Sequence, residues 1–243
     1  MLSRIYDIAK KAAEPYGEDI ATFITTDDKR IADHAEELGA ACINTSPSCR
    51  TGSDRVLSAI RQLNDWPEFI INLQGDAPFT NPKTIQNMIE AYQENRFHEV
   101  ITPVQNLSWV DLDRLRELKK KTPFSGTTAV IDNKKNALWF SKNIIPVIRK
   151  EDALRQSSPL SPVYQHIGLY GFRSDILERF CMLPEGQYES FEGLEQLRML
   201  ENGIRIHTIE IENKDGDIQS GIDSPEDLKR AEAHIRKHGE PHS

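Results

Sequence analysis

The sequence has few cysteines, no long apolar run and no excess of positive charge. Its 243 residues include three cysteines, Cys42, Cys49 and Cys181, which lack the spacing of a metal site. So sparse a set argues against a disulfide framework and is typical of a reducing cytoplasm. No stretch is long and apolar enough to cross a membrane, and residues 1–10 lack the apolar core of a signal peptide. We therefore predict a cytoplasmic protein with no membrane partner.

The charge balance argues against a nucleic-acid-binding protein. The formal net charge is −8 at pH 7, from 30 lysines and arginines against 38 aspartates and glutamates. Because no global basic field would attract a polynucleotide, we expect no nucleic-acid partner, and any pocket for an anion must be local. No linker rich in proline, glycine or serine divides the chain. We therefore expect residues 1–243 to form a single domain.

The stretch at residues 69–82 organises the predicted fold. It opens as a short apolar run, typical of a strand buried on both faces, and then meets a glycine, Asp76 and Pro78. Proline cannot donate to a strand ladder, so the strand must end near Asp76. Open α/β sheets bind ligands beyond the carboxyl ends of their strands, which makes Asp76 a candidate for chemistry. The alternative is that Asp76 only caps the helix that begins near Lys83.

Strands and helices alternate through the first half of the chain. The sequence pattern predicts helices at residues 2–13, 31–38, 55–63 and 83–95, and strands at residues 20–26 and 40–44. This alternation is typical of an α/β fold with a mostly parallel central sheet and helices on both faces. The second half is less regular. There we predict a hairpin insertion of strands 127–131 and 137–140, a mobile loop at 149–161, a strand at 163–172 and a helix at 192–201.

The first candidate for chemistry is the run Thr-Gly-Ser-Asp-Arg at residues 51–55, at a predicted junction of loop and helix. The backbone N–H groups and the positive end of a helix dipole favour an anion there, and Arg55 is a forked donor for one. The alternative, at least as well supported by these residues alone, is a helix cap followed by a surface arginine.

The second candidate is the pair Asp76 and Asp223. Each follows a short β-rich run and opens a turn. Two strand ends could therefore bring the carboxylates around one hard divalent cation that also holds phosphate oxygens. Capping is the alternative for Asp223, but Ser224, just before Pro225, already supplies a helix cap.

The third candidate lies in the predicted strand at residues 163–172. Strand alternation places His166, Gly168 and Tyr170 on one face. Two polar rings that flank a glycine suit a polar ligand, although a lone histidine on a strand is more often structural.

Four further polar residues have weaker local signals. Lys142 and Arg149 flank Pro146 and could together bind a carboxylate, although isolated cations usually face solvent. Helical periodicity places Glu195 and Gln196 on a solvated face, opposite a buried stripe of leucines. Taken alone, the local pattern assigns none of the four a role.

Seven different short motifs lie along the chain, at residues 25–31 (TTDDKRI), 51–55 (TGSDR), 72–76 (NLQGD), 138–142 (LWFSK), 165–171 (QHIGLYG), 194–198 (LEQLR) and 222–228 (IDSPEDL). Together they resemble the 3-deoxy-manno-octulosonate cytidylyltransferases (CMP-Kdo synthetases), which activate the acidic sugar Kdo for lipopolysaccharide assembly. The resemblance implies a fold of nucleotide-diphospho-sugar-transferase type and a homodimer. It also implies transfer of CMP from CTP to a sugar acid, with release of pyrophosphate and with Mg²⁺ as the cofactor.

The resemblance implies roles for individual residues as well. Asp76 and Asp223 would hold Mg²⁺ and act in catalysis. Ser53, Arg55 and Gln74 would lie against the nucleotide. The sugar acid would be surrounded by Lys142, Arg149, His166, Tyr170, Glu195 and Gln196.

The sequence departs from the family's pattern in ways that bear on activity. By the resemblance, Met1 aligns with the end of the family's N-terminal phosphate-binding loop, so we expect that loop and the strand before it to be absent. Ala77, Lys142 and Thr128 stand where the family has glutamate, arginine and often lysine. Because lysine does not reproduce a bidentate arginine grip, the acceptor could be a relative of Kdo. The alternatives are a catalytically impaired member that binds a sugar acid or partner without turnover, and a sugar nucleotidyltransferase for another base or acceptor.

Overall fold

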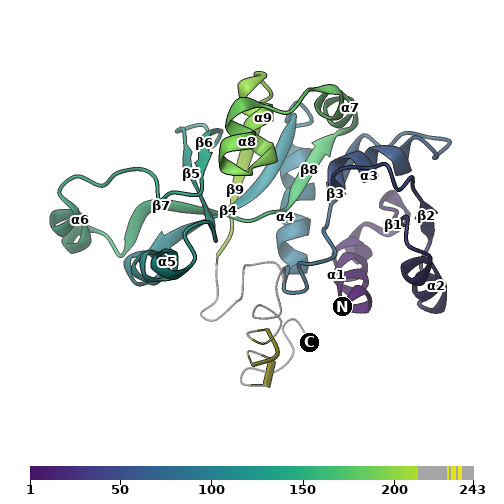
Figure 1. Cartoon of the computed structure of the whole chain (residues 1–243), viewed down its shortest axis with the longest axis horizontal. Helices are drawn as coiled ribbons and strands as arrows, with labels where there is room; N and C mark the ends of the chain where they lie inside the picture. The colour runs from purple at the N-terminus through teal and green to yellow at the C-terminus, as the bar shows by residue number, and fades with distance from the viewer. Residues whose placement is uncertain (213–228, 230, 234, 237–243) are drawn as a thin grey trace.

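The computed structural model describes residues 1–212, 229, 231–233 and 235–236. The first half contains α1 (Leu2–Ala13), the 3-10 helix η1 (Glu14–Asp19), β1 (Ile24–Thr26), α2 (Lys29–Glu37), β2 (Cys42–Asn44), α3 (Gly52–Ile60), β3 (Phe69–Asn72) and α4 (Pro82–Glu94). The second half contains β4 (Val100–Ser108), α5 (Trp109–Lys121), β5 (Thr127–Ile131), β6 (Ala137–Ser141), α6 (Glu151–Ser157), β7 (Leu160–His166), β8 (Tyr170–Arg173), α7 (Ser174–Met182), α8 (Gln187–Glu192), α9 (Glu195–Glu201) and β9 (Ile206–Glu210). Figure 1 shows the first elements at one end of the molecule and an arm that carries α5 and α6 at the other.

The predicted helices of the first half are confirmed to within a few residues, and their starts follow from local caps. At the start of α3 the side chain of Thr51 accepts a hydrogen bond from the backbone N–H of Asp54. At the start of α4 the side chain of Asn81 accepts from the N–H of Lys83, and Pro82 occupies the first helical position. None of the helices in the described part of the chain is long and apolar enough to span a bilayer.

The main sheet is largely antiparallel, so the prediction of a mostly parallel sheet was wrong. Its strands are ordered β3-β8-β4-β7-β5-β6, with β9 also paired to β4. Within the described residues only β1–β2, in a separate two-stranded sheet, and β4–β9 are parallel pairs. The reason lies in the connections of the second half. Strands joined by short turns, such as β5 and β6, can pair only antiparallel.

Helices cover both faces of this sheet, as predicted. Val100 and Ile101 are neighbours on β4 and point to opposite faces, yet both are completely buried. Val100 packs in a core with residues of α3, α7 and α9, whereas Ile101 packs in a second core with residues of α1 and α4. A central strand buried on both sides is the arrangement that an α/β fold requires.

The predicted hairpin is confirmed, but two other predictions for the second half need correction. The helix predicted at residues 192–201 is α9, which begins only at Glu195, because Gly193 takes a left-handed conformation (φ +63°) that ends the preceding helix, α8. The strand predicted at residues 163–172 is broken between β7 and β8. At the break the N–H of Ile167 donates to the carbonyl of Pro103 (3.1 Å), and the hydroxyl of Thr102 donates to the carbonyl of Leu169 (2.8 Å).

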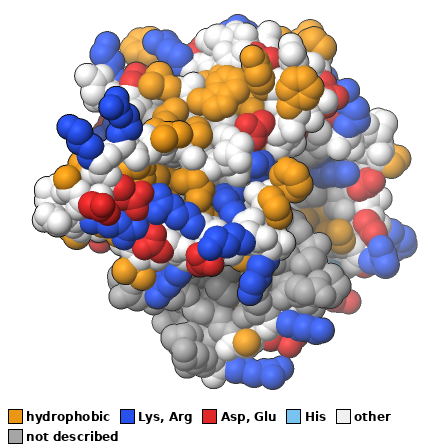
Figure 2. All heavy atoms as spheres, turned by 60° about the vertical axis from the view of Figure 1, so that its left-hand side comes forward, with side chains coloured by type: hydrophobic (Ala, Val, Ile, Leu, Met, Phe, Trp, Pro, Cys, Tyr) orange, Lys and Arg blue, Asp and Glu red, His pale blue; other side chains and the backbone are white. Residues whose placement is uncertain are grey.

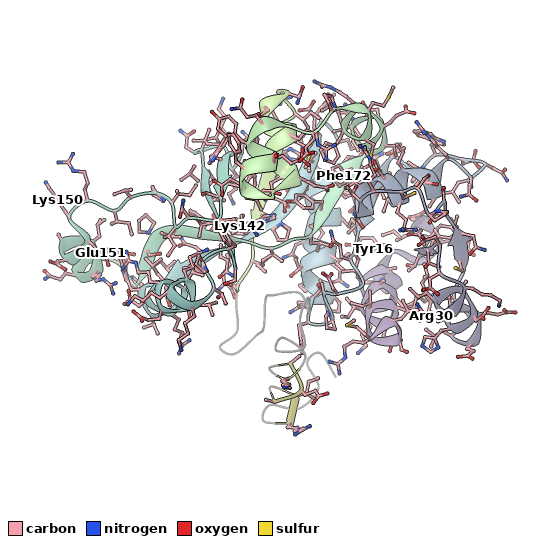
Figure 3. All side chains as sticks on the ribbon, viewed as in Figure 1. Tyr16, Arg30, Lys142, Lys150, Glu151 and Phe172 are labelled. Atoms are coloured by element: carbon pink, nitrogen blue, oxygen red, sulfur yellow. The ribbon has the colours of Figure 1, made fainter. Side chains whose placement is uncertain are left out.

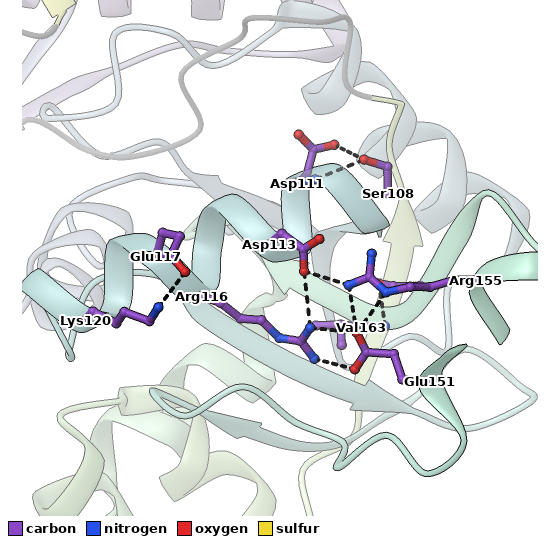
Figure 4. A network of polar contacts seen from close by, with 10 residues as sticks. Ser108, Asp111, Asp113, Arg116, Glu117, Lys120, Glu151, Arg155 and Val163 are labelled. Carbon is purple, nitrogen blue, oxygen red and sulfur yellow. Dashed lines mark hydrogen bonds and ion pairs between the residues drawn. The ribbon is translucent and has the colours of Figure 1, made fainter. Parts of the chain in front are cut away.

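The predicted loop at residues 149–161 instead contains α6, which is tied to α5 by a charged network (Figure 4). Arg116 makes a two-pronged contact with Glu151, with both N···O distances 2.8 Å. Arg155 reaches Glu151 and Asp113, each at 2.7 Å. Hydrogen bonds from Arg116 and Arg155 lower the pKa of Glu151 to about 2. A helix this short has too little periodicity to be predicted, and its partners lie far away in the sequence.

Candidate active site

Asp76 lies where the sequence predicts, in a half-buried turn that follows β3. It does not cap α4, because Asn81 fills that position. The capping alternative for Asp76 is therefore wrong. Asp223, its predicted partner, lies outside the described residues, and the shared metal site stays a prediction.

The first turn of α3 lies against the end of β3. Gly52 has no side chain, and a Cβ built there would be 3.5 Å from Nδ2 of Asn72 and 3.9 Å from Nε2 of Gln74. The N-terminus of a nine-residue helix and the side chain of Gln74 thus face the same space. Such a helix start presents unpaired N–H groups that can bind a phosphate.

Arg55 is not the surface arginine of the alternative interpretation. Its side chain is only 24% exposed and lies 2.8 Å from Oδ1 of Asp27. It also donates to the hydroxyl of Thr45 at 2.8 Å. These two partners hold the guanidinium in one direction beside the first turn of α3.

A hydrogen bond joins this turn to α9. The hydroxyl of Ser53, which is buried, donates to Oε2 of Glu195 at 3.2 Å. The other carboxylate oxygen, Oε1, is buried and has no hydrogen-bond partner, and Nη2 of Arg198 lies 3.6 Å away. The ion pair with Arg198 offsets part of the cost of burying this charge.

The solvated face predicted for Glu195 and Gln196 from periodicity was wrong. Gln196 is only 4% exposed, and Glu195 contacts Ser53 from a different part of the chain. The helix begins only at Glu195, so its first turn is packed against α3 and α8 and does not continue an exposed face.

His166 and Tyr170 come together although the strand between them is broken. Their ring centroids are 5.4 Å apart. Burial, together with the carboxylate of Glu195, raises the pKa of Tyr170 well above its ordinary value. Burial and, secondarily, the ammonium of Lys142 lower the pKa of His166 to about 3. The charges that act on the two rings therefore belong to two other residues of the predicted sugar site, Lys142 and Glu195.

His166 is a neutral imidazole with a defined hydrogen position. Its Nε2 lies 2.9 Å from the hydroxyl oxygen of Thr102. That hydroxyl donates to the carbonyl of Leu169, so its oxygen accepts the N–H of the imidazole. The hydrogen is therefore on Nε2, and Nδ1 keeps a lone pair that can accept a hydrogen bond.

Lys142 follows β6 and lies beneath α8 near the middle of the molecule (Figure 3). Arg149, by contrast, is exposed in the segment before α6. Its neighbours Lys150 and Glu151 lie at the tip of the arm, well away from Lys142 in Figure 3. The structure therefore brings Ser53, Glu195, Tyr170, His166 and Lys142 into one cluster. Arg149 lies apart from it, and its role stays a prediction.

Several residues of this region were not singled out by the sequence. Asp27 could have been, because it lies in the motif at residues 25–31. Thr102, Lys119 and Glu192 had no local signal, because each acts through a contact with a distant segment.

The described residues contain no group of three or more histidine, cysteine, aspartate or glutamate side chains that could hold a metal. A magnesium site does not require such a group. Mg²⁺ commonly needs only one or two protein carboxylates, since substrate phosphates and water complete its shell. Asp76 offers one such carboxylate in the turn that follows β3.

Comparisons with known proteins define the class of this chain. Its fold resembles that of a solved structure entitled CMP:2-keto-3-deoxy-manno-octonic acid synthetase complexed with CTP, with a TM-score of 0.79, 26% identity, and coverage of 96% of this chain and 88% of that one. A cytidylyltransferase from Leptospira borgpetersenii shares the fold at a TM-score of 0.54 and 15% identity, over 97% of this chain and 75% of that one. This is the α/β fold of nucleotide-diphospho-sugar transferases.

The sequence comparisons are more specific. The profile of the cytidylyltransferase family matches residues 1–206. A 3-deoxy-manno-octulosonate cytidylyltransferase from Maricaulis maris is 38% identical over 99% of this chain and 88% of that protein. Another from Anaeromyxobacter is 36% identical over 96% of this chain and 85% of that protein. The chain belongs to the cytidylyltransferase family, a family of nucleotidyltransferases.

Proposed function

We propose that this chain transfers CMP from CTP to Kdo or a closely related 2-keto-3-deoxy sugar acid, in the synthesis of lipopolysaccharide or surface-polysaccharide precursors. The observation that carries the proposal is one continuous cluster of polar groups. It runs from the first turn of α3 through Ser53, Glu195, Tyr170 and His166 to Lys142. One end suits the phosphates of a nucleotide, and the other end suits a carboxylate.

The reaction is a displacement at phosphorus. The anomeric hydroxyl oxygen of the sugar acid attacks the α-phosphorus of CTP and forms a new P–O bond. The bond from that phosphorus to the pyrophosphate oxygen breaks, pyrophosphate leaves with its electron pair, and the proton of the hydroxyl passes to solvent. Catalysis of this kind depends mainly on positioning and on neutralising charge, which are the tasks that the cluster can perform.

Each residue of the cluster has a task that follows from its chemistry. The ammonium of Lys142 pairs with the carboxylate of the sugar acid. Nδ1 of His166 and the carboxylate of Glu195 accept hydrogen bonds from sugar hydroxyls, since each of these groups can act as an acceptor. Arg55 and the N–H groups at the start of α3 bind the phosphates or the base of CTP.

Magnesium is the cofactor of this proposal. Asp76 and Asp223 would hold it, and it would supply positive charge that neutralises the phosphate oxygens. The supporting observation is that Asp76 lies in the turn after β3, the strand whose end packs against the first turn of α3.

The test is pyrophosphate release from CTP with Mg²⁺ and a panel of acceptors that includes Kdo and related sugar acids. We expect release with CTP and at least one 2-keto-3-deoxy sugar acid, and an Asp76→Asn variant should lose at least about 100-fold in kcat/KM. Absence of release with every acid, from a folded protein, would contradict the proposal. Substitution of ATP, GTP or UTP for CTP tests the choice of base.

The alternative of a catalytically impaired binding protein is not favoured, because the relatives that span nearly the whole chain are named as cytidylyltransferases. Two further features belong to the proposal. The protein acts in the cytoplasm, where CTP is made, and its three cysteines are free thiols. It is a homodimer, and the exposed aromatic residues on α8 are the supporting observation.

A further inference from the structure

The segment that leaves β6 is held by hydrogen bonds from three elements. This segment comprises residues 141–145, and Lys142 directly follows the last residue of β6, Ser141. The hydroxyl of Thr128 on β5 donates to the carbonyl of Asn143 at 2.7 Å and accepts from the N–H of Ile145 at 3.0 Å. The other two elements are α5 and the C-terminal end of α8. The backbone around Lys142 is thus far more constrained than that of an ordinary strand end.

The contact from α5 is made by Lys119. Among the contacts described, its ammonium donates to backbone carbonyl oxygens: those of Ser125 (2.6 Å), Gly126 (2.8 Å) and Lys142 (2.5 Å), with the carbonyl oxygen of Pro123 farther away at 3.4 Å. An ammonium has three hydrogens, so the three shorter bonds use all of them. Lys119 therefore has no hydrogen left for a substrate, and any effect on a ligand must pass through Lys142.

The contact from α8 is made by Glu192. Its Oε2 accepts the backbone N–H of Lys142 at 2.7 Å, and its Oε1 accepts the hydroxyl of Ser141 at 2.8 Å. Both backbone groups of Lys142 are then bound by charged side chains of opposite sign. Burial and the neighbouring Lys142 ammonium lower the pKa of Lys119, whereas Glu192 raises it. The carboxylate thus offsets the repulsion between two ammonium groups that lie close together.

We propose that Lys119 and Glu192 are positioning residues that fix the backbone of Lys142 and thereby aim its ammonium at the carboxylate of the acceptor. This inference rests on the proposed function. A lysine side chain is long and flexible, so a fixed backbone limits the directions that its ammonium can take. The pair substitutes rigidity of the main chain for the rigid fork of an arginine.

The test compares Lys119→Met with Lys120→Met. Both lysines lie on α5, but Lys120 is exposed and bonds only to Glu117 at 2.6 Å among the contacts described. Binding of each sugar acid is measured by calorimetry with a non-hydrolysable CTP analogue present, so that no turnover is needed. For Lys119→Met we expect the Kd of the sugar acid to rise at least about tenfold and the Kd of the CTP analogue to change less than about twofold. Lys120→Met should match the wild type in both.

Glu192→Gln keeps the shape of the side chain and serves as the second variant if Lys119→Met does not fold. It should weaken binding of the sugar acid by a smaller factor than Lys119→Met does, and should leave binding of the CTP analogue unchanged. Hydrogen exchange provides a readout without ligand: the amides of residues 141–145 should exchange faster in both variants and not in Lys120→Met.

Three outcomes separate the two proposals. If the wild type binds none of the sugar acids, the proposed function fails and this inference fails with it. If the wild type binds one and the variants bind it equally well, only the positioning role is overturned. If the variants bind the sugar acid and the CTP analogue more weakly by the same factor, the fold is damaged in general. That result would also overturn the positioning role.

Discussion

His166 illustrates how burial decides the charge of a single residue. The ring is 9% exposed, lies against Phe140 and Tyr170, and is bonded through Nε2 to Thr102. Its surroundings therefore stabilise the neutral form, and its pKa falls to about 3 from an ordinary value near 6.5. In the unfolded chain the same imidazole would protonate near its ordinary pKa, so the unfolded state binds more protons between these two values.

This difference predicts the direction of a pH effect on stability. Below about pH 6.5 the unfolded state gains a proton at His166 that the folded state does not take up, so stability falls as the pH falls toward 3. When the pH is lowered from about 7.5 to about 5, the Tm of a His166→Gln variant should fall by less than the Tm of the wild type. Thermal unfolding followed by circular dichroism at several pH values measures this. Equal losses in the two proteins would contradict the neutral buried imidazole.

At the scale of elements, α6 is attached to the arm by charge more than by apolar packing, whereas α5 packs in an apolar cluster with Val163. None of the residues of α6 is buried, and its link to α5 is the network of Arg116, Arg155, Glu151 and Asp113. Arg155 also lies over the ring of Trp109, with its guanidinium carbon 4.6 Å from the ring centre. Partly exposed ion pairs contribute little each, but here two arginines share one carboxylate in good geometry.

We therefore predict that Glu151→Gln loosens α6 without unfolding the protein. The loss of global stability should be about 1 kcal/mol or less, whereas hydrogen exchange of residues 151–157 should become clearly faster. Glu117→Gln on α5 is the matched control. It removes the same charge, but from an ion pair with Lys120 in which both side chains are exposed. Unchanged exchange in the Glu151→Gln variant would show that the network does not hold the helix.

The whole molecule exposes aromatic side chains on the face that carries α8. Phe191 is 72% and Tyr188 46% exposed, and Tyr188 packs edge-on against Trp139 with ring centres 5.0 Å apart. Figure 2 shows hydrophobic side chains gathered in the upper part of this side of the molecule. Exposed apolar clusters of this kind commonly mark an interface between proteins.

If this face is the homodimer interface, Phe191→Ser should shift the protein toward a monomer. Light scattering after size-exclusion chromatography gives the mass directly, and we expect the dimer to dissociate at concentrations at least about tenfold higher than for the wild type. Phe97→Ser, at another exposed phenylalanine after α4, is the control and should leave the mass unchanged. A wild-type protein that is monomeric at all concentrations would contradict the homodimer itself.

Local signals in the sequence were enough to determine the ends of many elements and part of the site. The end of β3 shortly before Asp76, the cap at Asn81 and Pro82, and the start of α3 near Thr51 each follow from the residues at that place. The hairpin of β5 and β6 follows from a polar turn between two β-rich runs. The motifs also identified the family, and every predicted site residue except Arg149 lies within one of them.

Only the tertiary structure decided which strands pair and in which direction, and which polar side chains are buried. The alternation of strands and helices was correct for the first half but could not predict that the second half adds antiparallel strands to the same sheet. The burial of Gln196, the bond from Ser53 to Glu195 and the contact of Lys119 with Lys142 join residues far apart in the chain. The physical reason is that periodicity and caps act within a few residues, whereas pairing and burial depend on which distant segments meet.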